Sequence, residues 1–452
     1  MSDLDRGLFG EAEVAARFSD RARLQAMLDF EAALADAEAE AGVVPHSCVA
    51  AVRAAARAEH YDLDAIATEA ANAGNVAIPL VRHLTKRVAA TDPEAARYVH
   101  WGATSQDVLD TALVLQLRAA VPEVLRHLAR AADAASGHAE RHADTPMAGR
   151  TWLQQATPVT FGLKAAGWLE ALERAHDRIT AALADALVLQ LGGASGTLAA
   201  LGDKAAAVAR ALGARPDLPV PDLPWHAHRD RLAHLAGTLG VAVGTLGKIA
   251  RDVSLLAQTE VGEAHEAPAE GRGGSSTMPH KRNPVGAAVA LAAAIRTPGL
   301  VATFLAAMPQ EHERGLGGWP AEWETLPELV LLAAGAARAM ADCLDGLVVD
   351  PARMRANLEL TRGLVMAEAV SMALAVPMGK EAAHRAVEEA SRRALAASRP
   401  LAEVLAEDPT ITRHLSAAEI EARLAPEGYL GAAGEFVRQV LARRRRRGAG
   451  HA

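Results

Sequence analysis

The sequence predicts an all-α protein in which a central bundle of long helices carries helical cap domains at both ends. Half of the 452 residues are hydrophobic but only 3% are aromatic. The core must therefore use small aliphatic side chains, which suit closely packed helices. Apolar residues recur at helical spacing through the middle of the chain. Alternating polar and apolar residues are almost absent, so no sheet of any size is expected.

Two helices are predicted in the first third of the chain. One runs from Ser19 and stops at Gly42, with an apolar stripe at Leu24, Met27, Leu28 and Leu34. A much longer helix begins at Thr104, and Pro122 is a position where it can bend. Its apolar positions are Leu113, Leu117, Val121, Val124, Leu125 and Leu128.

Three more helices are predicted before residue 310. The third begins at Thr157-Pro158, which are typical of an N-cap and a first helical residue, and runs through Leu163, Ala166, Leu169 and Leu172. The fourth spans about Trp225 to Thr259, and the fifth begins at Asn283-Pro284 in the same way as the third. Long helices joined by short glycine-bearing connectors are typical of a bundle.

Composition changes suggest three domains. Residues 1–105 are expected to form an N-terminal cap, residues 106–345 the long-helix bundle, and residues 346–452 a C-terminal cap with shorter, more charged helices. Broad faces of small apolar residues on several helices would leave apolar surface on a monomer. Self-association into a larger bundle is therefore expected.

Charge and cysteine content exclude several classes of protein. A net charge of −8 disfavours nucleic acid or an anionic membrane as a partner, and the basic run Arg443–Arg447 is interpreted as a solvated tail. The two cysteines, Cys48 and Cys343, lack the spacing of a disulfide framework or a zinc site, and no metal is expected. The acidic N-terminus lacks a signal core, and no apolar run reaches the ~18 residues of a membrane span. A soluble, cytoplasmic protein is expected.

Three polar segments interrupt the helical pattern: HWGATSQD (His100–Asp107), GRTWLQQATP (Gly149–Pro158) and GRGGSSTMPHKRNP (Gly271–Pro284). Each precedes a predicted helix, whose N-terminal dipole and free N–H groups favour anions. Their Ser and Thr hydroxyls can donate hydrogen bonds to carboxylate oxygens. If the segments converge, they bring His100, Arg150, Lys281 and Arg282 into one cationic pocket for a small polycarboxylate.

Structural explanations compete with this interpretation. Thr104 and Ser105 can simply cap a helix, with Asp107 closing a capping box. Arg150 can form a surface ion pair of little energetic value, and Trp152 alone is more typical of packing. The third segment is harder to explain by structure alone, because ordering a glycine-rich loop costs conformational entropy.

The three motifs together resemble the fumarase/aspartase superfamily, which includes argininosuccinate lyase and adenylosuccinate lyase, over essentially the whole chain. The resemblance implies a long-helix bundle that tetramerises, with each active site built from three subunits. It also implies β-elimination from a succinyl-type acid through an aci-carboxylate carbanion, without a cofactor. The position that acts on the carbon-bound proton is Ser275 in this chain.

Two departures from the superfamily pattern narrow the expectation. Members that catalyse elimination typically read G-R-T-H in the second motif, whereas this chain has Trp152, which cannot exchange protons. The positions that hold the nucleotide phosphate in adenylosuccinate lyase correspond to Trp319, Pro320 and Trp323, so a nucleotide substrate is disfavoured. Both departures resemble the 3-carboxymuconate cycloisomerase branch, which adds a substrate carboxylate across a conjugated double bond to form a lactone.

That reaction explains why the histidine is dispensable. The nucleophile is a carboxylate with a pKa near 4 and is already ionised at pH 7, so it needs no general base. The enzyme must stabilise the enediolate and deliver one proton, from either Ser275 or Lys281. The other candidate residues bind the small tricarboxylate substrate or shape its pocket; they are His100, Thr104, Ser105, Arg150, Thr151, Trp152, Gln155, Ser276, Thr277, Met278, Asn283 and Arg314. His280 is a candidate orienting residue.

Two other functions stay open. The chain can be a superfamily lyase that acts on another 2-substituted succinate. It can also be a non-enzymatic helical scaffold that inherited the fold, although the presence of Ser275, Lys281 and Asn283 together argues against this.

Overall fold

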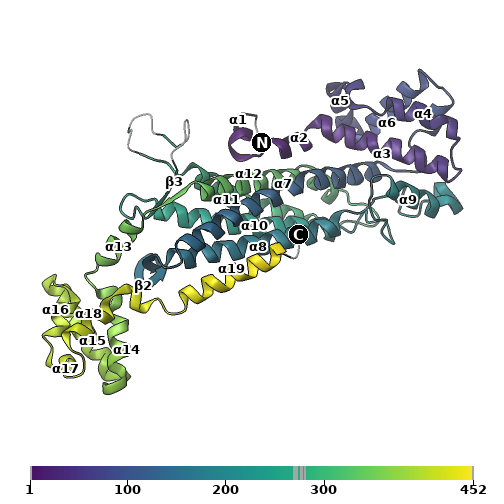
Figure 1. Ribbon diagram of the computed structural model, residues 1–452. Helices are drawn as coiled ribbons and strands as arrows, with labels where there is room; N and C mark the ends of the chain where they lie inside the picture. The colour runs from purple at the N-terminus through teal and green to yellow at the C-terminus, as the bar shows by residue number, and fades with distance from the viewer. Residues whose placement is uncertain (1–2, 268–272, 275–277, 279–280, 450–452) are drawn as a thin grey trace. The chain divides into compact units, whose positions relative to one another are not determined.

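A computed structural model describes residues 3–267, 273–274, 278 and 281–449 of the chain. Most of these residues lie in helices, which confirms the predicted all-α class (Figure 1). The chain divides into two compact units. Unit 1 comprises Met1–Leu128, Arg174–Gly247 and Val289–Ala339, and unit 2 comprises Ala129–Glu173, Lys248–Ala288 and Met340–Ala452. The division falls within all five long helices, so each unit contains part of the bundle, and the three-domain division stays a prediction.

The long helices are α7 (Ser105–Arg141), α8 (Phe161–Ala186), α10 (Asp230–Leu256), α11 (Val285–Ala306) and α12 (Gly318–Asp345). They are preceded by α1 (Asp3–Phe9), α2 (Ala12–Arg17), α3 (Asp20–Glu40), α4 (His46–Ala55), η1 (Ala58–His60), α5 (Leu63–Ala73), α6 (Ala77–Ala89) and η2 (Ala95–Tyr98). Between them lie β1 (Pro146–Thr151), β2 (Gln154–Thr160), η3 (Ala199–Lys204), α9 (Ala205–Ala214) and β3 (Ala264–Glu266). They are followed by β4 (Leu347–Val349), α13 (Pro351–Glu359), η4 (Leu364–Met366), α14 (Ala367–Met378), α15 (Lys380–Ala397), α16 (Leu401–Ala406), α17 (Pro409–Thr412), α18 (Ala417–Leu424), η5 (Pro426–Tyr429) and α19 (Ala433–Ala449).

Local sequence signals account well for the first two predicted helices. Ser19 caps α3 by accepting a hydrogen bond from the Ala22 N–H, and Gly42, with a positive φ of 72°, follows its end. The predicted stripe of α3 is buried. Helix α7 continues through Pro122 as one element, and its predicted apolar positions are buried except Leu113 and Leu125, which are half-buried.

Small residues allow helices α10 and α11 to pack closely within unit 1. A Cβ atom placed on Gly240 would lie 2.8 Å from Val301 Cγ2, and one on Gly247 would lie 2.6 Å from Ala294 Cβ. Both distances are below van der Waals contact, so even alanine at these two positions would push the helices apart. This confirms the prediction that thin side chains build the core.

Helices α10 and α11 are also long and apolar enough to cross a membrane, by length and composition alone. The sequence prediction considered only uninterrupted apolar runs, whereas these stretches of Ala, Gly, Val and Leu pass by mean hydropathy despite an occasional charge. The two helices differ in burial. In their most apolar 18-residue windows, 61% of α10 but only 28% of α11 is buried. Helix α11 thus presents an apolar face that the described residues do not cover.

A hairpin replaces the predicted start of the third helix. Thr157 and Pro158 lie in β2, where Pro158 pairs with Ala148 of β1. Helix α8 starts at Phe161, and the Thr160 hydroxyl caps it by accepting from the Leu163 N–H at 3.0 Å. This hairpin and the pair β3–β4 form two two-stranded sheets that the sequence pattern did not predict.

Two further helix starts also differ from the prediction. Helix α10 begins at Asp230, five residues after the predicted start, and α11 begins at Val285. The cap of α11 comes from a distant residue: Glu266 accepts from the Gly286 and Ala287 N–H groups at 3.1 and 2.9 Å. A negative carboxylate at this position also complements the helix dipole.

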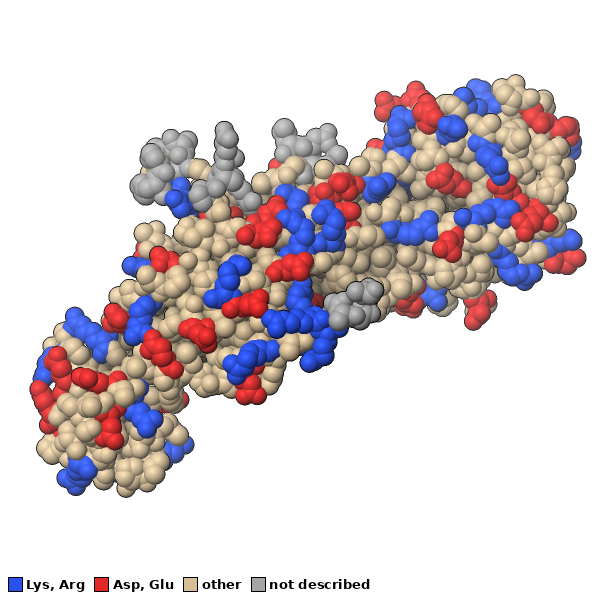
Figure 2. Space-filling model, in the orientation of Figure 1, with Lys and Arg blue, Asp and Glu red and all other residues tan. Residues whose placement is uncertain are grey.

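In unit 2, the predicted basic tail is part of a docked helix. Helix α19 carries Arg443 and Arg444, which donate to Glu173 on α8 at 3.3 and 2.8 Å. Arg443 also donates to Glu170. Figure 2 shows Lys and Arg side chains gathered beside Asp and Glu side chains along the C-terminal part of α19, as placed in Figure 1. The prediction of a solvated tail was wrong, because acidic residues on α7 and α8 match these charges.

We expect the variant Glu173→Gln to lower the free energy of unfolding by about 1 kcal/mol, because it leaves the arginines of α19 without their best-buried acceptor. The loss should shrink in 1 M salt, which screens the ion pairs of wild-type protein. Glu140→Gln is the matched control, since Glu140 and its partner Arg445 are both exposed. Thermal unfolding of the three proteins at low and high salt measures the effect, and equal melting temperatures would contradict it.

Candidate active site

The predicted site residues are distributed over both units. Ser275, Ser276, Thr277 and His280 lie outside the described residues. The predicted residues in unit 1 are His100, Thr104, Ser105 and Arg314. Those in unit 2 are Arg150, Thr151, Trp152, Gln155, Met278, Lys281 and Asn283.

In unit 1, Arg314 joins the first motif to the stretch after α11. Its Nη1 donates to the Thr104 hydroxyl at 3.1 Å, and its Nη2 donates to the carbonyls of Gly193 and Ala194 at 3.4 and 3.2 Å. The first of these contacts uses two residues that the sequence predicted to share a site. Arg314 Nε is buried and has no hydrogen-bond partner among the described residues, so the guanidinium retains a free donor.

The Asp107 side chain fixes the backbone around Thr104 and the glycine connector. It is fully buried, and its carboxylate accepts from the N–H groups of Thr104 (3.0 Å), Gly192 and Gly193 (both 2.9 Å). A fourth contact comes from His226 Nε2 at 2.7 Å. The bond to Thr104 is the Asp107 half of the predicted capping box. Two of the other bonds tie α7 to the glycine connector, and the third ties it to His226, just before α10. Asp107 therefore does more than cap a helix.

His100, a predicted carboxylate clamp, is paired with a residue that the sequence did not reveal. Glu31 on α3 is buried, and its Oε1 lies 2.7 Å from His100 Nδ1. Burial alone would lower the pKa of His100, but the charges of Glu31 and Asp107 outweigh burial and raise the pKa above the usual value. His100 also has a positive φ of 61°, which is uncommon for a residue with a Cβ.

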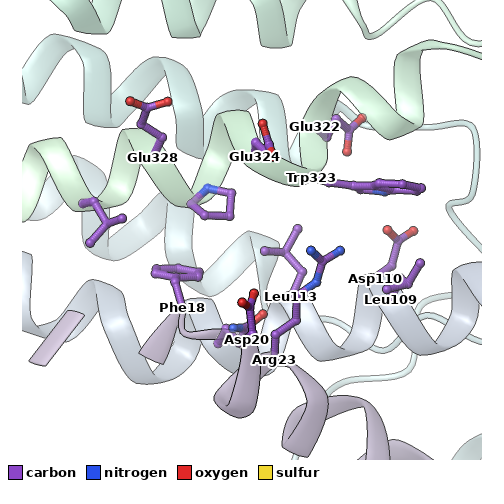
Figure 3. Close-up of a pocket in the computed structure, with 13 residues that line it drawn as sticks. Phe18, Asp20, Arg23, Leu109, Asp110, Leu113, Glu322, Trp323, Glu324 and Glu328 are labelled. Carbon is purple, nitrogen blue, oxygen red and sulfur yellow. The ribbon is translucent and has the colours of Figure 1, made fainter. Parts of the chain in front are cut away.

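A cavity of about 440 Å³ in unit 1 has the wrong charge for a polycarboxylate (Figure 3). Two of its carboxylates, Asp110 and Glu322, are already paired with the buried guanidinium of Arg229. The other charged groups that line it are the carboxylates Asp20, Glu324 and Glu328 and the single cation Arg23. A polyanion would meet net repulsion there, so the cationic loops are better candidates for the substrate site.

The same region shows why a phosphate has no clamp. Trp319 is buried and donates its Nε1–H to Asp110 at 3.1 Å, and Trp323 packs edge-on against it with ring centroids 5.0 Å apart. Figure 3 shows Trp323 at the cavity beside Glu322 and Asp110. Two indole rings and adjacent carboxylates offer no bidentate donor for a phosphate group.

In unit 2, Arg150 is engaged by a buried acid. Its two terminal nitrogens donate to Glu263 at 2.8 and 2.6 Å, and Asn357 Nδ2 donates to the same carboxylate at 2.7 Å. Glu263 is completely buried, which fixes the guanidinium in place. Gln155 is also anchored, through a 2.9 Å hydrogen bond to the Asn357 carbonyl. This geometry favours a positioning role for Arg150, and its predicted contact with substrate stays a prediction.

The tip of the β1–β2 hairpin is strained and exposed. Trp152 and Leu153 have φ values of 52° and 63°, although two-residue hairpin turns with positive φ normally use Asn or Gly. Their side chains are 98% and 76% exposed. An apolar pair held in this conformation outside any core is typical of a contact surface.

The third motif is closed at its base. Asn283 N–H donates to the Gly273 carbonyl at 2.9 Å, and Gly274 forms an antiparallel bridge with Arg282. Gly273 has a positive φ of 72°, and a Cβ there would lie 2.7 Å from the Asn283 carbonyl oxygen, so only glycine fits. Lys281 and Met278 are exposed.

Relatives with known names share this architecture. A family described as "Lyase" matches residues 11–299, and one described as "Adenylosuccinate lyase C-terminus" matches residues 363–440. The chain is 58% identical over 96% of its length to a 3-carboxy-cis,cis-muconate cycloisomerase of Pseudomonas aeruginosa, covering 95% of that protein. It is 46% identical over 95% of its length to a nitrosuccinate lyase of Streptomyces davaonensis, covering 92% of that protein.

A solved structure is also similar to this chain in both fold and sequence. The structure of 3-carboxy-cis,cis-muconate lactonizing enzyme from Pseudomonas putida superposes with a TM-score of 0.93 at 53% identity, covering 98% of this chain and 99% of that chain.

We expect Arg150→Ala to lower the free energy of unfolding by about 3 kcal/mol, because it leaves the Glu263 carboxylate buried without its cation. Arg150→Lys keeps the charge but loses the two-point contact, so its loss should be smaller. Urea unfolding of both variants tests the positioning role. An Arg150→Ala protein as stable as wild type would instead indicate that the guanidinium is free to bind a ligand.

Proposed function

This chain belongs to the lyase family, and on that premise we propose that it converts 3-carboxy-cis,cis-muconate into 4-carboxymuconolactone. The observation that carries the proposal is the match, over nearly the full length, to proteins named for this reaction in both sequence and structure. Trp152 supports it independently, since an indole cannot serve as the general acid or base that elimination usually requires.

The reaction forms one C–O bond and moves one proton. A carboxylate oxygen of the substrate attacks the conjugated double bond, and the displaced electron pair moves into the remote carboxylate, which becomes an enediolate. The carbon next to that carboxylate then takes up a proton, which completes the lactone. The nucleophile is ionised at neutral pH, so the protein contributes geometry, charge stabilisation and the proton.

The two units carry different parts of the proposed chemistry. In unit 1, the Thr104 hydroxyl and the partly exposed His100 ring are donors suited to substrate carboxylates, and Arg314 holds the Thr104 hydroxyl in place. In unit 2, the third motif carries Ser275 and Lys281, one of which delivers the proton. Trp152 shapes the pocket and holds the diene in a folded, near-attack geometry.

We also infer that the active enzyme is a homotetramer with active sites shared between subunits. The apolar face of α11 and the exposed tip at Trp152 and Leu153 are surfaces that other copies of the chain would cover. Sharing would bring the first motif of one subunit to the second and third motifs of others. The proposed substrate is a small tricarboxylate, and its conversion needs no cofactor. We propose that the enzyme acts in the cytoplasm.

A second candidate is a lyase that eliminates the substituent of another 2-substituted succinate. The similarity of this chain to a nitrosuccinate lyase supports this alternative. That reaction releases fumarate, whereas lactonization releases nothing, so the products distinguish the two functions directly.

We expect purified enzyme at micromolar concentration to remove the ultraviolet absorbance of 3-carboxy-cis,cis-muconate, because lactone formation breaks the conjugated diene. Adenylosuccinate should stay intact, since Trp319, Pro320 and Trp323 provide no phosphate clamp. Spectrophotometry and product analysis measure both. An unchanged spectrum together with fumarate release from a 2-substituted succinate would transfer the proposal to the lyase alternative.

Substitution of the two candidate proton donors should identify the one that acts. If Ser275 delivers the proton, Ser275→Ala should lower kcat by about 10²- to 10⁴-fold, while Lys281→Met should mainly raise KM. The reverse pattern would assign the proton to Lys281. Solvent deuterium incorporation at the protonated carbon provides the matching readout. Wild-type turnover in both variants would contradict the role of the third motif.

A further inference from the structure

His100 is hydrogen-bonded to a buried carboxylate of unit 1 rather than lying free at the surface. Glu31 Oε1 lies 2.7 Å from its Nδ1. Asp107 on α7 is the second charge that acts on the ring. A carboxylate can only accept a hydrogen bond, so Nδ1 carries the proton at this contact. The ring therefore presents its other nitrogen, Nε2, away from Glu31.

A second buried acid, Glu38, lies on α3 near Glu31, and its charge state matters for His100. Glu38 lies two helical turns beyond Glu31 and is fully buried, and neither of its carboxylate oxygens has a hydrogen-bond partner among the described residues. Burial and the nearby Glu31 raise the pKa of Glu38 to about 9. Glu38 is therefore neutral at pH 7 and adds no negative charge beside Glu31.

The backbone supports the same arrangement. His100 has a φ of 61°, which costs conformational energy in a residue with a Cβ, and such strain persists where the surroundings fix it. The bond to Glu31 is one such contact, since it attaches the segment before Thr104 to α3. A surface histidine that served no recognition role would not require this strain and a buried acceptor together.

We infer that Glu31 is a positioning residue that keeps His100 as an imidazolium and directs its Nε2–H toward a substrate carboxylate. The inference rests on the proposed function. It gives the first motif a cation that does not depend on the third motif, and it assigns a role to an acid 69 residues away in the sequence. With Nδ1 bound to Glu31, an imidazolium donates a stronger hydrogen bond from Nε2 to a substrate carboxylate than a neutral imidazole does.

Three variants of the full-length protein test the inference: Glu31→Gln, Glu38→Gln as the matched control, and His100→Gln to assign the ring signals. Glutamine at position 31 keeps an acceptor but removes the charge, whereas glutamine at position 38 replaces a group that is already neutral. In an NMR titration of histidine-labelled protein, we expect the pKa of His100 to fall in Glu31→Gln and to stay at the wild-type value in Glu38→Gln. An unchanged pKa in Glu31→Gln would overturn the inference.

Kinetics test the recognition role. We expect Glu31→Gln to raise KM for 3-carboxy-cis,cis-muconate about tenfold with little change in kcat, because a charged contact is lost in substrate binding. Binding requires the protonated ring, so activity falls as pH rises through the pKa of His100. Lowering that pKa should move the alkaline limb of kcat/KM to lower pH. Glu31→Asp should keep the wild-type limb.

A merely structural role for Glu31 predicts a different result. Glu31→Gln would then reduce stability or activity equally at every pH, and the limb would not move, which would overturn the inference. If wild-type enzyme leaves 3-carboxy-cis,cis-muconate unchanged, the proposed function fails instead. The NMR comparison needs no substrate, so it still decides whether Glu31 sets the charge of His100.

Discussion

The acceptance of four hydrogen bonds by the Asp107 carboxylate is the interaction on which the first motif depends. One buried side chain gathers the N–H groups of Thr104, Gly192 and Gly193 and the ring of His226. Each of these donors would be costly to bury without an acceptor. One turn along α7, Asp110 similarly receives the buried guanidinium of Arg229. Two carboxylates near the beginning of α7 thus accept hydrogen bonds from several buried donors. Because these bonds fix the backbone around Thr104, its hydroxyl lies within reach of Arg314.

Much of the fold could be predicted because the long helices depend on local rules. Periodicity and a serine cap were enough to place α3, and the same periodicity located the core face of α7. The hairpin at residues 146–160 escaped prediction because its turn uses Trp152 and Leu153, which carry none of the usual turn signals. The cap of α11 escaped prediction because Glu266 lies 20 residues away from the helix it stabilises.

The candidate site divides in the same way. Residues inside the three motifs were identifiable because hydroxyl, imidazole and guanidinium side chains gather there within short polar segments that interrupt an alanine-rich helical pattern. Glu31 and Glu263, which hold His100 and Arg150, were not identifiable. Glu31 lies in an ordinary helical stretch, and Glu263 meets Arg150 only when the chain folds. Site residues that act through other residues leave little trace in local sequence, since their partners are chosen by tertiary structure.

The docking of α19 has a consequence for how the protein is made. Glu170 and Glu173 on α8 are synthesised more than 250 residues before Arg443 and Arg444, which neutralise them. Domains generally begin to fold during synthesis, so this acidic surface can form first and remains unmatched until α19 has been synthesised. A chain that terminates early exposes the surface permanently. The acidic surface of α8 therefore has to stay in solution without its partners until α19 docks on it.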